Sequence, residues 1–232
     1  MGFLGTAIGQ VGVTTFGIQV KPVFPLSFFD PLTSFERPFV RASLELEGGM
    51  AFGMVVRTGL TKSVSLETGI NQITRRYRFD LANDTSGHRE RGAIRFVGYE
   101  VPVLALVYIR LGERTWMNNA LGFSADLYPS DATVLLDRSQ AYLFRRNWVQ
   151  LGVVGNIGVE YRTERAGYFY LGATFHRPFA DMAQADISWL DRRFVPYTTT
   201  GFLDGSYLTL DVRYFFHEDP DKARLRRARR GN

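Results

Sequence analysis

The chain has 232 residues, enough for one barrel-sized domain or a tight pair of smaller domains. Apolar residues make up 45% of it, which argues against wholesale disorder, and the 14% aromatic content with 23 glycines favours an all-β chain rich in turns. The formal net charge is +5, but the segment 217–232 holds six Lys/Arg against three Asp/Glu. Since the rest of the chain is nearly neutral, we do not expect a nucleic-acid-binding protein.

The chain has no cysteine, which fits an envelope protein without disulfides but is also common in the cytosol. Its longest strongly apolar run, 101–109, is too short for a membrane helix. A membrane protein of this sequence would therefore have to be a β-barrel, whose backbone hydrogen bonds are satisfied between strands.

The first 13 residues have no Lys or Arg near their start, so they make a poor secretory signal. An outer-membrane protein needs such a signal. We therefore expect a processed or trimmed chain, or a start codon placed too late.

The first predicted strand, 14–22, has Phe16, Ile18 and Val20 on one face and is ended by proline. A loop over 25–41 follows. The second strand, 44–60, places one apolar set on one face and a small or charged set, including Glu45 and Glu47, on the other.

The third strand, 63–77, becomes charged at its distal end, as a strand leaving a bilayer should. A polar loop over 80–92 leads to the fourth strand, 94–111. The fifth strand covers 116–128, and a loop over 129–146 follows it.

The sixth strand, 149–162, shows the two-faced pattern most clearly. Its uncharged face consists of Val149, Leu151, Val153, Gly155, Ile157, Val159 and Tyr161. The seventh strand is 168–176, a loop over 177–205 follows, and the eighth strand is 206–216.

Long connections alternate with the short turns 61–62, 112–114 and 163–167, as in outer-membrane barrels with short periplasmic turns and long extracellular loops. A soluble barrel or sandwich also alternates, with its apolar face inward. The uncharged apolar faces, the glycines on the polar faces and the aromatic residues at strand ends favour the membrane arrangement. We predict an all-β fold: an N-terminal segment 1–13, an eight-stranded antiparallel transmembrane β-barrel over 14–216, and a basic periplasmic tail over 217–232.

The last strand, with Tyr207, Tyr214 and the terminal Phe216, resembles the closing strand of outer-membrane proteins. The segments 51–72, 99–111 and 149–161 resemble small OmpA-like outer-membrane barrel proteins of Bacteroidota. The resemblance implies a bacterial outer-membrane location, contact with outer-membrane lipid and protein partners in the envelope. One candidate that it suggests is the small barrel subunit of the type 9 secretion machinery.

Charged side chains on the polar faces would fill the narrow lumen of an eight-stranded barrel, where they must pair. We expect a salt-bridged plug from Glu45, Glu47, Arg57, Glu67, Glu100, Arg110, Asp126, Glu160, Asp211 and Arg213. The alternative is a gated ion path along the same residues.

His88 and His176 are expected in or beside extracellular loops, and their spacing to Ser and acidic residues supports no catalytic triad. No metal-ligand spacing or phosphate-binding loop is present, so we expect no cofactor. The tail offers a docking site for an acidic partner through Arg224, Arg226, Arg227, Arg229 and Arg230.

The sequence thus predicts a non-enzymatic outer-membrane barrel that serves as an anchor or accessory subunit of an envelope complex. The alternatives are an outer-membrane enzyme acting on lipid and a narrow pore.

Overall fold

The computed structural model describes residues 12–25, 32–164, 166–190 and 196–216, and these form strands joined by turns, without any helix. No helix in these ranges is long and apolar enough to cross a membrane. The strands are β1 (Thr14–Phe24), β2 (Leu32–Arg37), β3 (Val40–Gly59), β4 (Val64–Asn83), β5 (His88–Arg110), β6 (Thr115–Leu127), β7 (Ala132–Leu135), β8 (Ser139–Arg145), β9 (Val149–Arg162), β10 (Tyr168–Pro178), β11 (Ala183–Leu190), β12 (Pro196–Leu203) and β13 (Tyr207–Phe215).

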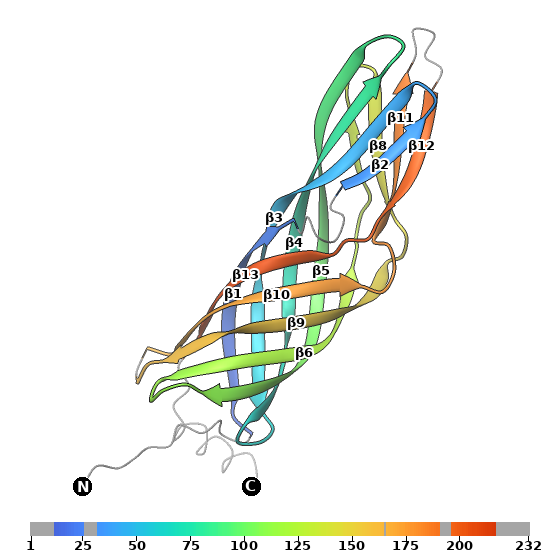
Figure 1. Cartoon of the computed structure of the whole chain (residues 1–232). Helices are drawn as coiled ribbons and strands as arrows, with labels where there is room; N and C mark the ends of the chain where they lie inside the picture. The colour runs from blue at the N-terminus through green and yellow to red at the C-terminus, as the bar shows by residue number, and fades with distance from the viewer. Residues whose placement is uncertain (1–11, 26–31, 165, 191–195, 217–232) are drawn as a thin grey trace, which may run out of the picture.

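Eight of these strands form a ring of antiparallel pairs (Figure 1). The order is β1-β13-β10-β9-β6-β5-β4-β3, and β3 also pairs with β1, from Thr14 opposite Thr58 to Val23 opposite Gly49. The eight ring strands are the eight that the sequence predicts, so the all-β antiparallel prediction is confirmed. Turns of a few residues join β3 to β4, β5 to β6 and β9 to β10 at one end of the ring.

The outward face of the ring carries a continuous apolar band. On β9 the exposed large side chains are Val149, Leu151, Ile157, Val159 and Tyr161. From Val149 to Tyr161, at about 3.3 Å per residue and the usual barrel tilt of 35–45°, the band spans roughly 30 Å. The other ring strands continue the band with Phe16, Ile18, Val20, Phe52, Met54, Leu66, Ile70, Val103, Val107, Leu121, Phe123, Phe169, Leu171, Leu210 and Val212.

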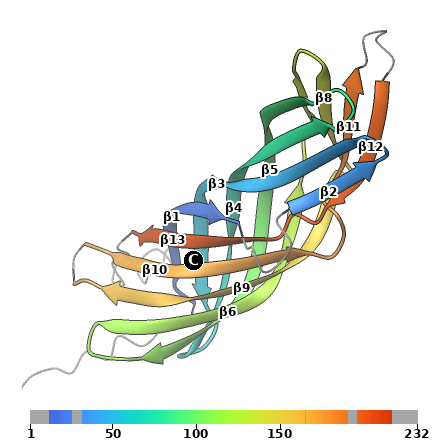
Figure 2. The same cartoon turned by 45° about the horizontal axis from the view of Figure 1, so that its top comes forward.

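The strands β3, β4 and β5 are about 20 residues long and extend well beyond the ring. There a second sheet, with the order β12-β11-β8-β7, lies beside them at the end away from the short turns (Figures 1 and 2). One apolar core fills the space between the two sheets. Its large members are Leu44, Tyr77, Phe79, Ile94, Phe96, Leu143, Met182 and Ile187.

The strands β2, β7, β8, β11 and β12 fall within ranges that the sequence analysis predicts as loops. The second of those predicted loops, 80–92, consists mostly of the ends of β4 and β5, with a turn at 84–87. These segments form strands because the protruding ends of β3–β5 offer them an apolar face to cover.

A β-bulge in β3 changes which side chains face inward. The register of β3 on β4 shifts between Leu46 and Gly48, so that Glu47 is an extra residue. Before the bulge Leu44 and Leu46 are buried, and after it Ala51 is buried while Met50 is exposed. An inserted residue exchanges the two faces of a strand, which strict alternation cannot anticipate.

Candidate functional site

The interior of the ring is the most concentrated polar feature of the described residues. The interior of an eight-stranded ring is just wide enough for side chains to fill. The buried polar side chains in it are Gln19, Lys21, Arg57, Ser65, Glu67, Asn71, Arg75, Glu100, Asn118, Ser124, Asp126, Gln150, Asn156, Glu160, Thr174, His176, Thr209, Asp211 and Arg213.

An ion-pair chain runs across the part of the interior near the short turns. Arg57 on β3 contacts Glu67 at 2.8 Å (Nη2 to Oε2) and Glu160 at 2.5 Å (Nη1 to Oε2). Arg213 on β13 donates to the other Glu67 oxygen at 2.5 Å and to Asp211 at 2.6 Å. Because the chain joins β3, β4, β9 and β13, it ties opposite walls of the ring together.

Further donors complete this chain. Arg162 donates to Glu160 at 2.6 Å, and Asn118 donates to it at 3.0 Å. Lys21 lies 3.7 Å from Asp211. The buried carboxylates therefore have charged or hydrogen-bonding partners, which a desolvated charge requires.

The interior charges balance. The buried carboxylates are Glu67, Glu100, Asp126, Glu160 and Asp211. The facing cations are Lys21, Arg57, Arg75, Arg213 and the nearly buried Arg162. The five carboxylates are thus matched by five cations, whereas a selective ion path usually has an excess of one sign.

A second cluster lies farther from the short turns, around the fully buried His176. The His176 Nε2 atom is 2.9 Å from Asp126 Oδ2, 3.0 Å from Ser124 Oγ and 3.8 Å from Glu100 Oε2. The His176 ring stacks on Tyr207, whose hydroxyl donates to Glu100 at 2.5 Å. Asn71 donates to the other Glu100 oxygen at 3.0 Å.

This cluster resembles a serine–histidine–acid set in composition but not in connectivity. In such a set the serine and the acid contact different ring nitrogens. Here Ser124 and Asp126 both contact Nε2, and Nδ1 has no hydrogen-bond partner. The arrangement holds the imidazole in place but provides no proton relay from the serine to the acid.

Three residues of this cluster, Glu100, Asp126 and His176, are the set among the described residues that could hold a metal ion. Their ligand atoms lie within 4.8 Å of one another. A metal would have to replace the hydrogen bond between His176 and Asp126, and the Nδ1 atom would still lack the acceptor that usually orients a metal-bound histidine.

Arg75 lies between this cluster and the apolar core of the two sheets. It is buried, its guanidinium lies 4.8 Å from the centre of the Tyr207 ring, and its Nη1 atom contacts Met182 Sδ at 3.1 Å. Since Met182 belongs to that core, the polar interior ends against packed apolar side chains.

The structure buries seven of the ten predicted lumen residues in the ring interior: Arg57, Glu67, Glu100, Asp126, Glu160, Asp211 and Arg213. It corrects the other three. Glu45 and Glu47 lie on the outward face, where they pair with Arg76 and Arg78, because the bulge exchanges the faces of β3.

Arg110 is also exposed, at the end of β5. Its Nε donates to the carbonyl oxygen of Gly112, and its guanidinium lies over the Trp116 ring. The predicted docking residues Arg224, Arg226, Arg227, Arg229 and Arg230 lie outside the described residues.

His176 was expected beside a loop and Arg75 at the charged end of a strand leaving the membrane, and neither was among the predicted lumen residues. Both lie in the interior. The sequence signal that could have found them is the two-residue spacing of side chains on one face of a strand. His176 is two residues from Thr174, and Arg75 is two and four residues from Ile73 and Asn71, all of which face inward. His88 does lie next to a turn, and it contacts Glu90 at 2.9 Å.

Comparisons with known proteins bear on the fold. No protein-family model matches the chain, and no curated protein sequence matches it. Among solved structures, the outer membrane protein OprG from Pseudomonas aeruginosa is 12% identical with a TM-score of 0.56, and the match covers 91% of this chain and all of OprG. The chain therefore shares the all-β antiparallel fold of an outer-membrane protein.

Two further structures match less closely. The outer membrane protein AlkL is 10% identical with a TM-score of 0.43, over 90% of this chain and 93% of AlkL. The outer membrane protease OmpT from Escherichia coli is 8% identical with a TM-score of 0.37, over 88% of this chain and 96% of OmpT.

Proposed function

We propose that this protein is a plugged, non-enzymatic β-barrel of a bacterial outer membrane that acts as an anchor or accessory subunit of an envelope complex. The ring of eight strands crosses the membrane, the short turns face the periplasm, and the second sheet with the ends of β3–β5 projects outside the cell. The fold shared with OprG supports this placement.

The observation that carries the proposal is a reversal of polarity along the outward face. On β4, Leu66 and Ile70 face outward within the apolar band, and Arg76, Arg78 and Asp80 face outward beyond it. The inward side chains of β4 change in the opposite direction, from the polar Glu67 and Asn71 inside the ring to the apolar core residues around Phe79 in the extension. Lipid around the ring and water around the extension explain both changes.

The ion-paired interior supports a plug rather than a pore. Reconstitution in planar lipid bilayers tests this part of the proposal. We expect no steady conductance steps from the intact chain. Steady open channels would favour the narrow pore instead.

The projecting sheets support the role in a complex, because they provide a rigid surface outside the membrane. The resemblance to Bacteroidota barrels makes a type 9 secretion complex one candidate. Purification from native membranes in mild detergent tests the proposal through the proteins that co-elute. A protein that elutes alone, as a monomer, from membranes of cells expressing it natively would contradict the accessory role.

A further inference from the structure

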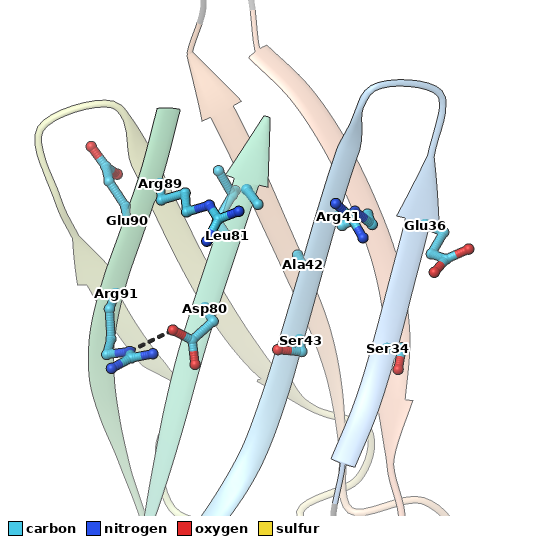
Figure 3. A pocket seen from close by; sticks show the side chains of 11 residues that line it. Ser34, Glu36, Arg41, Ala42, Ser43, Asp80, Leu81, Arg89, Glu90 and Arg91 are labelled. Atoms are coloured by element: carbon cyan, nitrogen blue, oxygen red, sulfur yellow. Dashed lines mark hydrogen bonds and ion pairs between the residues drawn. The ribbon is translucent and has the colours of Figure 1, made fainter. Parts of the chain in front are cut away.

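A hollow of about 650 Å³ lies on the outward face of the extension, across β2, β3, β4 and β5 (Figure 3). It is separate from the ring interior. Its lining residues are Ser34, Glu36, Arg41, Ala42, Ser43, Asp80, Leu81, Ala82, Arg89, Glu90 and Arg91.

Strand register explains the shape of the hollow. One row across the four strands is Glu36, Arg41, Ala82 and Arg89, each opposite the next. The neighbouring row is Ser34, Ser43, Asp80 and Arg91. Ser34, Ser43 and Ala82 are small and form a low floor. The longer charged side chains of the same rows stand around this floor.

The lining has three arginines and three acids, and the ion pairs leave one guanidinium, that of Arg89, without a partner among the described residues. Arg41 is paired with Asp84 at 2.7 Å, and Arg91 is paired with Asp80 at 2.5 Å. Arg89 is exposed, has no hydrogen bond or ion pair within the described residues, and extends from β5 across β4 toward the middle of the hollow (Figure 3). Glu90 is engaged elsewhere, with His88 and Ser139.

The distance of the hollow from the membrane distinguishes between a lipid phosphate and other anionic ligands. Ala82 comes six residues after Arg76, where the outward face of β4 becomes charged. This separation is roughly 20 Å along the strand and, at the barrel tilt of 35–45°, roughly 15 Å in height. The headgroup layer of a bilayer is only about 5–8 Å thick on each side. A lipid phosphate is therefore too close to the membrane, whereas the glycans of a cell surface reach this height.

We propose that this hollow binds an anionic saccharide. Its phosphate or carboxylate group lies between Arg89 and Arg41, where a guanidinium can donate two parallel hydrogen bonds. The sugar hydroxyls contact Ser34, Ser43 and Asp80, which offer donors and acceptors along the floor. The hollow is large enough for a few sugar rings.

Titration calorimetry on the full purified chain in detergent tests the proposal. The probes are a phosphorylated mannose pentamer, a galacturonic acid pentamer and the neutral maltopentaose. We expect at least one anionic pentamer to bind, more weakly as salt rises, and the neutral pentamer not to bind. Binding of one anionic probe alone identifies which group the site takes.

The critical variant is Arg89→Ala, with Arg95→Ala as its control. Arg95 is an exposed outward residue of the same strand that lies outside the hollow. We expect Arg89→Ala to weaken binding about 10-fold to 100-fold, Arg89→Lys to weaken it less, and Arg95→Ala to leave it unchanged. Absence of binding by both anionic pentamers, or equal loss in both alanine variants, would overturn the proposal.

The choice of a saccharide over a lipid phosphate, and the biological source of that saccharide, rest on the proposed location at the cell surface. The binding itself does not, because calorimetry uses isolated protein. A protein that binds but is found outside the outer membrane would refute the proposed function and leave the saccharide site standing.

Discussion

At the scale of single residues, Arg213 is the best test of the buried ion-pair chain, because it joins Glu67 to Asp211 with both partners desolvated. Removing one partner of a buried pair leaves an uncompensated charge, which costs about 3–5 kcal/mol. We expect Arg213→Ala to lower the stability of the folded barrel by that amount, measured by urea unfolding in detergent micelles.

The exposed pair of Arg114 and Glu164 is the control for Arg213. Solvent screens this pair, so Arg114→Ala should change the free energy of unfolding by less than about 1 kcal/mol. Equal effects of the two substitutions would show that the interior is hydrated rather than sealed.

Glu90 makes the stability of the extension depend on pH. Burial raises the pKa of its carboxyl, but hydrogen bonds from Ser139, His88 and the backbone of Arg138 outweigh burial and leave the pKa below its usual value of 4.5. Because the pKa is lower in the folded state, the stabilisation is complete above about pH 4.5 and is lost as the pH falls through the folded value.

We therefore expect the contact between β5 and the start of β8 to loosen in acid. Hydrogen exchange of the 139–145 amides, compared across this acid range, measures the loss. Glu90→Gln should remove most of this pH dependence. An unchanged acid response in that variant would assign the effect to other carboxyls.

At the scale of the elements, the bulge in β3 sets which face each half of that strand presents. Gly48 in the bulge has a φ of 140°, which L side chains rarely adopt, and a Cβ there would meet the Val23 carbonyl oxygen at 3.0 Å. We expect Gly48→Ala to destabilise the fold by roughly 1–3 kcal/mol in the same urea assay.

Gly112 provides the matched glycine control. It has ordinary backbone geometry, and its added Cβ would have only a 3.9 Å contact with Thr115. Gly112→Ala should therefore be close to neutral. A Gly48→Ala variant as stable as Gly112→Ala would mean that the bulge can relax without cost.

The ring strands were predictable because each keeps a period of two between an apolar outward face and a polar inward face. The bulge was not predictable, because both halves of the strand 44–60 keep a regular alternation of side chains on either side of the one extra residue. For the same reason Glu45 and Glu47 were assigned to the interior although they lie outside. The pairing of β8 with β11 escaped prediction because the two strands are distant in sequence.

The interior site was predictable only in part. Charged residues at inward positions, such as Glu67 and Asp211, could be predicted because they lie on the strand face opposite the apolar one. The cluster around His176 depends on which strands face one another across the ring, and strand alternation does not contain that information. Arg75 was missed because the interior continues past the point where the outward face becomes charged.

At the scale of the whole molecule, the polarity of the surface defines three levels. The short turns lie at one end, the apolar band surrounds the ring, and the charged extension with its second sheet lies at the other end (Figure 1). In the proposed arrangement these levels lie in the periplasm, in the outer membrane and outside the cell.

Because the chain has no cysteine, single cysteines can report these levels directly. The variants are Ser86→Cys in the β4–β5 turn, Phe123→Cys in the apolar band and Glu113→Cys in a short turn. A membrane-impermeant maleimide applied to intact cells should label only Ser86→Cys, and Glu113→Cys should react once the outer membrane is permeabilised. Labelling of Glu113→Cys or Phe123→Cys on intact cells, with Ser86→Cys protected, would contradict the account.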